Sequence, residues 1–114
     1  MVSDRASKPT PAVLTRLYKL IASRKGVSAK ESYTAKLFAD GTARIARKVG
    51  EEAVETVVAG MSESPQALAA ESADLLYHLM VLWADRGVMP EDVWAELARR
   101  EGTSGIAEKA ARRK

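Results

Sequence analysis

The sequence predicts an all-α protein, a bundle of helices joined by short loops. Apolar residues recur at helical spacing in several segments, and Ser, Thr, Pro and Gly stand where those helices should begin and end. No segment alternates apolar and polar residues with the period of two that a half-buried strand requires. The 114 residues fit one domain, and the longest apolar run is well short of the roughly 18 residues that cross a membrane.

The first helix is expected after a flexible N-terminus, residues 1–9. Thr10 as N-cap and Pro11 as the first helical residue open the segment PAVLTRLYKLIASRK, which should end at Gly26. Its apolar residues at helical spacing are Val13, Leu14, Leu17, Leu20 and Ile21. Ser32 is expected to cap a short helix over residues 33–40 that stops at Gly41.

Two long helices and a shorter one follow. The first runs from Thr42 to about Met61, and the second begins after the cap Ser64, with Pro65 at its first helical position, and runs to Gly87. Pro90 restarts a helix through residues 91–101. We therefore expect a domain over residues 10–105 and a basic tail, residues 106–114, that adds a further turn or two or dangles.

Composition and charge limit the classes of function. The absence of cysteine excludes disulfides, thiolate metal sites and cysteine nucleophiles, and it fits a cytoplasmic protein. The net charge of +3 comes largely from the ends of the chain, above all from EKAARRK. Such a tail is typical of a solubilising end rather than of a nucleic-acid-binding arm, and because no nucleic-acid motif accompanies it we expect neither nucleic acid nor membrane as a partner.

Carboxylates line one stripe on each long helix. At about 100° per residue, Lys48, Glu51, Glu52 and Glu55 share a stripe of the first, beside the apolar sector of Ile45, Val49, Ala53 and Val57. Glu71, Asp74, His78 and Asp85 share a stripe of the second, beside Leu75, Leu79 and Leu82. A tight turn between antiparallel helices would bring both stripes face to face.

Carboxylates gathered in this way repel one another and raise one another's pKa values. A hard divalent cation removes the conflict, because Mg²⁺ prefers oxygen ligands and commonly takes carboxylates together with phosphates. The absence of cysteine and of a histidine cluster argues against zinc. Ordinary solvated surface remains the alternative interpretation of each acidic pair taken alone.

Three segments carry a resemblance to a known family. SYTAKLFADG (32–41), KVGEEAVE (48–55) and ESADLLYHLMVLWADRG (71–87), in this order and at these separations, resemble phosphoribosyl-ATP pyrophosphatases of the all-α, MazG-like nucleoside triphosphate pyrophosphatase superfamily. The resemblance covers about residues 10–105. It implies magnesium-dependent hydrolysis of phosphoribosyl-ATP to phosphoribosyl-AMP and pyrophosphate, in histidine biosynthesis, by a homodimer.

The resemblance also implies roles for individual residues. Glu52 and Glu55 would be the Glu-x-x-Glu metal ligands, and Glu71 and Asp74 the Glu-x-x-Asp ligands. Glu51 would be either another ligand or the group that orients the attacking water. Positive charge must neutralise the polyphosphate, and Lys48, Lys36 and Arg44 are candidates that could equally pair with glutamates.

Three other residues each allow two interpretations. His78 is either a group behind the metal ligands or a packed, hydrogen-bonded residue, and Tyr33 and Tyr77 can stack on a base or fill the core. Trp83 and Trp94 are expected to pack, and Asp85 to pair with an arginine. The rival functions are a housecleaning hydrolase for canonical or damaged nucleoside triphosphates and a non-catalytic helical module that binds a basic partner.

Overall fold

The computed structural model describes residues 9–103 and 105–112, and in these residues every regular element is a helix, as predicted. The helices are α2 (Ala12–Ala22), α3 (Tyr33–Asp40), α4 (Thr42–Ser62), α5 (Pro65–Arg86), α6 (Pro90–Glu101) and α7 (Gly105–Arg112). The expected flexible N-terminus lies outside the described residues except for its last residue. None of the described helices has both the length and the apolar composition needed to cross a bilayer.

Local capping explains where several helices begin and end. Ser32 Oγ accepts a hydrogen bond from the Ala35 amide at 2.8 Å, and Ser64 Oγ accepts one from the Ala67 amide at 3.1 Å. Gly87 ends α5 in the left-handed conformation, with φ of 78°. These features were predicted from the sequence and are confirmed.

The first helix is shorter than predicted. It ends at Ala22, and residues 23–26 form turns that reach Gly26. Its N-cap is Pro11 rather than Thr10, although Thr10 Oγ1 still accepts a hydrogen bond from the Ala12 amide at 3.2 Å. The difference at the N-terminal end is one residue, because the backbone of Pro11 is already helical, with φ of −56°.

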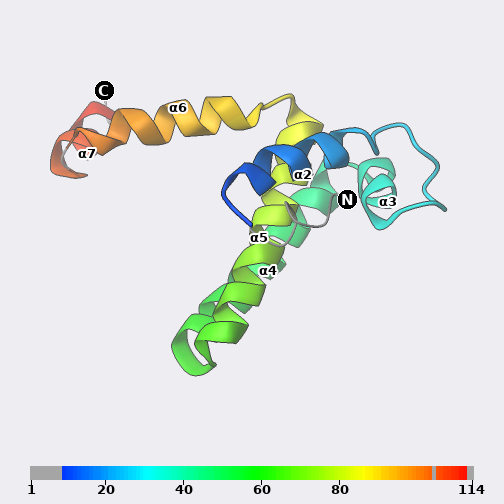
Figure 1. Ribbon diagram of the computed structural model, residues 1–114, viewed down its shortest axis with the longest axis horizontal. Coiled ribbons are helices and arrows are strands. Elements are labelled where there is room, and N and C mark those ends of the chain that lie inside the picture. Colours follow the sequence, from blue (N-terminus) through cyan, green and yellow to red (C-terminus); the bar gives the residue numbers. More distant parts are fainter. Residues whose placement is uncertain (1–8, 104, 113–114) are drawn as a thin grey trace.

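A long antiparallel hairpin of α4 and α5 forms the centre of the molecule, and α2 and α3 pack on one of its ends (Figure 1). The core lies at that end and is built from aliphatic side chains with one aromatic ring: Tyr18, Ile21, Leu37, Ile45, Met80, Val81 and Ala84. The other end of the hairpin, where α4 turns into α5, projects alone from this body in Figure 1.

Helices α6 and α7 extend sideways from the far end of α5 (Figure 1). An aromatic contact connects this arm to the hairpin: Trp94 of α6 meets Trp83 of α5 edge to face, with ring centroids 6.1 Å apart. The radius of gyration of 16.4 Å exceeds the roughly 13 Å expected for a compact domain of this length. The basic tail, for which a further turn or two was one of two expectations, contains α7 over its described residues.

Candidate functional site

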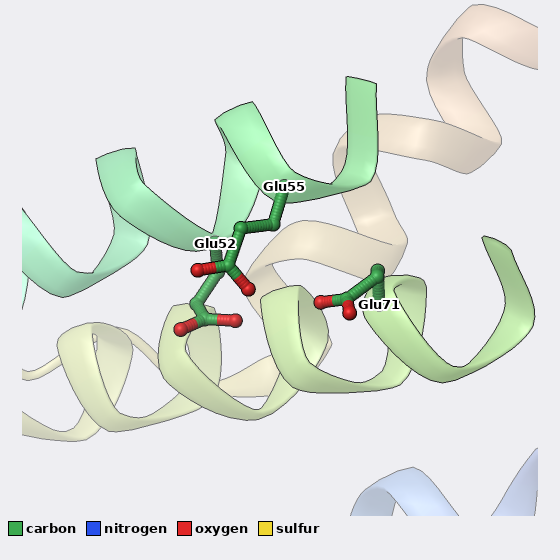
Figure 2. A group of neighbouring side chains, drawn as sticks. All are labelled: Glu52, Glu55 and Glu71. Carbon is green, nitrogen blue, oxygen red and sulfur yellow. The ribbon is translucent and has the colours of Figure 1, made fainter. Parts of the chain in front are cut away.

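Glu52, Glu55 and Glu71 lie together between α4 and α5, near the middle of the hairpin (Figure 2). One oxygen from each of the three side chains lies within 4.8 Å of the others. Glu52 and Glu55 project from α4 and Glu71 from α5, so the two acidic stripes do face each other as the sequence predicted. We call these three residues the carboxylate cluster.

The members of the carboxylate cluster differ in burial. Glu52 is only 6% exposed, Glu71 is half-buried, and Glu55 is exposed. Glu52 itself therefore lies on the buried face of α4. The sequence had placed the carboxylates next to that face, beside an apolar sector that included Val57. This apolar sector is buried only in part, because Ile45 is buried whereas Val57 is 63% exposed.

Val57 is exposed because α2 and α3 cover only one end of the hairpin. At that end Ile45 is fully buried in the core. Beyond Glu52, α4 packs mainly against α5, and the valines on its outer side, Val54, Val57 and Val58, are exposed.

Thr56 ties the two helices together at the carboxylate cluster. Its Oγ1 donates to the carbonyl oxygen of Glu52, one turn earlier on α4, at 2.8 Å, and lies 3.2 Å from the carbonyl oxygen of Glu71 on α5. The sequence interpretation did not include Thr56. Its position four residues after Glu52, on the same face of the helix, was the available signal.

Glu71 carries the clearest electrostatic signs of a missing partner. Burial raises the pKa of its carboxyl above the ordinary value, and the charge of Glu55, a hydrogen bond with Glu55 and the charges of Asp74 and Glu52 raise it further. Its Oε1 atom is buried and has no hydrogen-bond partner among the described residues. Buried oxygens are normally satisfied, so an unsatisfied carboxylate oxygen that faces two other carboxylates fits a bound cation.

Asp74 lies one turn after Glu71 on α5 and is exposed. Its carboxylate is not part of the group within 4.8 Å, although its charge contributes to the raised pKa of Glu71. Glu51 is exposed as well, and its Oε1 lies 3.4 Å from Lys48 Nζ. The structure therefore brings three of the five predicted acidic residues into one cluster and leaves Asp74 and Glu51 at its margin.

The three predicted phosphate-binding cations lie in different surroundings. Lys48 Nζ lies 3.4 Å from Glu52 as well as from Glu51. Burial lowers the pKa of Lys48, but the interactions with Tyr33, Glu52 and Glu51 outweigh it and hold the pKa above the usual value. Arg44, one turn earlier on α4, has a buried Nε without a hydrogen-bond partner among the described residues. Lys36 pairs at 3.3 Å with Asp40 on the surface of α3.

His78 is a buried, hydrogen-bonded residue, as one of its two interpretations predicted. It is 7% exposed, its Nδ1 lies 2.8 Å from the carbonyl oxygen of Asp74, and its Nε2 lies 3.0 Å from the hydroxyl of Tyr33. Among the described residues, Asp85 does not pair with an arginine as expected; it accepts a hydrogen bond from the Thr42 hydroxyl at the start of α4.

Comparison with known proteins places these features in one family. Residues 14–101 match the family model described as phosphoribosyl-ATP pyrophosphohydrolase. The chain is 63% identical over 113 residues to the phosphoribosyl-ATP pyrophosphatase of Azospirillum brasilense, with 99% of each chain covered. It is 66% identical over 102 residues to the protein of the same name from Paramagnetospirillum magneticum, covering 90% of this chain and 94% of that one.

Proposed function

The chain belongs to the phosphoribosyl-ATP pyrophosphohydrolase family, and on that premise we propose that it hydrolyses phosphoribosyl-ATP to phosphoribosyl-AMP and pyrophosphate, a step of histidine biosynthesis. The observation that carries this proposal is the carboxylate cluster, with its unpartnered Glu71 oxygen, in the middle of the segments that resemble the family. The reaction breaks a phosphoanhydride bond, so it needs a positioned water and neutralised phosphoryl oxygens.

Magnesium is the proposed cofactor. Oxygen is the only donor that the carboxylate cluster offers, and hard cations such as Mg²⁺ bind oxygen ligands. Glu52, Glu55 and Glu71 would hold the ion, and Asp74 would join them by a change of rotamer from its exposed position one turn away. When bound, the ion supplies positive charge that neutralises the phosphates and lowers the pKa of water.

Two further groups have proposed roles toward the substrate. Glu51, exposed at the margin of the carboxylate cluster, would either complete the ligand set or accept a hydrogen bond from the attacking water. Lys48 lies against Glu52 and Glu51 and can turn its ammonium group to the phosphates without leaving the site.

Arg44 is the second proposed phosphate-binding cation. Its buried and unpartnered Nε supports that role, because a phosphate oxygen would satisfy the group. Lys36 has weaker support, since it already pairs with Asp40 on the surface.

The test is pyrophosphate release from phosphoribosyl-ATP, measured with Mg²⁺ and with EDTA. Glu55→Gln keeps the shape of the side chain and removes a ligand charge, so release should fall by at least about a hundredfold. Glu63→Gln makes the same chemical change at an exposed residue that closes α4, and it should leave the rate unchanged. Equal release by Glu55→Gln and wild type would reject the site assignment.

A substrate panel separates the proposed function from its rival. Robust turnover of dNTPs without turnover of phosphoribosyl-ATP would indicate a housecleaning pyrophosphohydrolase that uses the same carboxylates. The non-catalytic module predicts neither turnover nor a rise in melting temperature with Mg²⁺. The reaction is proposed to occur in the cytoplasm, which the cysteine-free composition supports.

We also propose that the protein works as a homodimer. The outer face of α4 exposes a run of apolar side chains: Val54 at 62%, Val57 at 63%, Val58 at 46% and Met61 at 82%. Apolar patches of this kind mark protein contacts, and the extended shape supports a partner that completes the core. Light scattering after size exclusion should give twice the chain mass, and Val57→Asp should reduce it to one chain, whereas Lys30→Glu on the exposed loop before α3 should not.

A further inference from the structure

Tyr33 differs from the other two tyrosines in the exposure of its side chain. The Tyr18 ring is buried and its hydroxyl donates to the carbonyl oxygen of Val88. Tyr77 is half-buried, and its hydroxyl is hydrogen-bonded to that of Thr34. Tyr33 is also anchored through its hydroxyl, but the residue remains 51% exposed. The fold therefore fixes this side chain without burying its ring.

His78 holds Tyr33 in one orientation. Its Nδ1 faces a backbone carbonyl oxygen, which can only accept, so Nδ1 carries the hydrogen and donates. In the neutral ring Nε2 is then the acceptor, and the Tyr33 hydroxyl donates to it at 3.0 Å. The two rings also meet edge to face, with centroids 5.9 Å apart and an interplanar angle of 80°. Such a pre-ordered side chain loses little conformational entropy when it binds a ligand.

The anchored ring stands at one end of the proposed active site. His78 follows Glu71 by two turns of α5, a rise of about 10 Å. On the α4 side, Tyr33 lies close enough to Lys48 to influence its pKa, and Lys48 Nζ lies 3.4 Å from Glu52. A nucleotide held by its phosphates at the carboxylate cluster and Lys48 would therefore extend its ribose and base toward Tyr33.

We propose that Tyr33 contacts the substrate by stacking its exposed ring on the nucleobase, and that His78 is the positioning residue that holds the ring for it. The proposal rests on the proposed function, because it takes a nucleotide as the ligand of the carboxylate cluster. Bases stack on tyrosine through their π-faces, and each such contact changes affinity by roughly 5- to 100-fold. His78 does not touch the substrate and acts only through Tyr33.

The test compares two ligands that share phosphates and differ in the base. For Tyr33→Leu, the KM for phosphoribosyl-ATP and the inhibition constant of phosphoribosyl-AMP should rise roughly 5- to 100-fold. The kcat should change less than about threefold, because stacking acts on ground state and transition state alike. The inhibition constant of inorganic tripolyphosphate, which has no base, should not change. Tyr33→Phe keeps the ring and should lose far less affinity.

Tyr77→Leu is the matched control. The Tyr77 ring also meets His78 edge to face, at 5.7 Å, but it is turned into the fold. The variant should lower the melting temperature without changing the ratio of the two inhibition constants. Should Tyr33→Leu not fold, Tyr33→Gln provides the same comparison, because it also removes the ring and leaves a polar side chain on this exposed position.

Two results would overturn the proposal: unchanged affinity for phosphoribosyl-AMP in the ring-free variant, or equal loss of affinity for both ligands. A wild-type protein that releases no pyrophosphate would instead refute the proposed function. In that case calorimetric binding of phosphoribosyl-AMP to wild type and Tyr33→Leu still decides between stacking and its absence.

Discussion

Replacing Glu71 by Gln should make the metal-free protein more stable than wild type and the magnesium-loaded protein less stable. Burial and the carboxylates of Glu55, Asp74 and Glu52 raise the pKa of the Glu71 carboxyl, so its ionised form is disfavoured in the folded state. Glutamine has nearly the same shape and no charge. The substitution therefore relieves the repulsion, and it also removes a proposed ligand.

The size of the magnesium effect follows from linkage. A cation that binds only the folded state stabilises it by about 2.7 kcal/mol at 100 times its Kd. With an unfolding entropy of about 2.1 cal/mol/K per residue, a chain of 114 residues gains roughly 10 °C in Tm. Glu71→Gln removes one of three carboxylates within 4.8 Å of one another, so most of this gain should vanish. Thermal scans with EDTA and with saturating Mg²⁺ measure the Tm of the metal-free and the magnesium-loaded protein.

The pH dependence has a defined sign. A carboxyl whose pKa rises on folding destabilises the native state above its ordinary pKa, here 4.5, and the penalty grows as pH rises through the raised pKa of Glu71. The metal-free Tm difference between variant and wild type should therefore be largest at neutral pH and disappear in acid. Glu63→Gln should change neither the metal-free Tm nor the rise in Tm with Mg²⁺. A Glu71→Gln protein with unchanged metal-free Tm at pH 7 and a full response to Mg²⁺ would refute this reasoning.

Three further outcomes test the fold. Ile45→Ala, at a fully buried core position, should lower the free energy of unfolding in urea by about 2–5 kcal/mol, and Leu20→Ala, at a position 50% exposed, should lower it much less. Ser64→Ala removes the N-cap of α5 and should cost about 1 kcal/mol in the same assay. Glu96 should titrate at about 2 by NMR because hydrogen bonds from two arginines on α6 favour its ionised form, so any stability from this contact is complete above 4.5 and is lost as pH falls through about 2.

The sequence predicted the helices well because their signals are local. Ser32 and Ser64 bind the amides three residues later, and Gly41 and Gly87 adopt positive φ where the helices end. Such bonds and dihedral preferences depend on a few neighbouring residues and can be inferred without knowing the rest of the fold. The end of the first helix at Ala22 was less predictable, because its apolar residues stop at Ile21 and the following polar residues have no clear breaker before Gly26.

The carboxylates of the site were also predictable as a set. Helical spacing places Glu52 and Glu55 on one stripe of α4 and Glu71 on one stripe of α5, and the short connection at Ser64 makes the two helices antiparallel neighbours. Spacing does not, however, fix rotamers. The structure gathers three carboxylates within 4.8 Å and leaves Asp74 exposed, which no periodicity could have indicated.

The amino-acid sequence by itself determined the helical class, most of the helix ends and the acidic stripes of α4 and α5, because these depend on local spacing, capping and the short connection at Ser64. Only the tertiary structure decided that Glu52 is buried while Val57 is exposed, and that His78 anchors an exposed Tyr33. Both depend on where α2 and α3 pack along the hairpin. They bury the end that holds Ile45 and leave the rest of α4 to solvent or to a partner, and long-range packing of this kind has no counterpart in the local pattern.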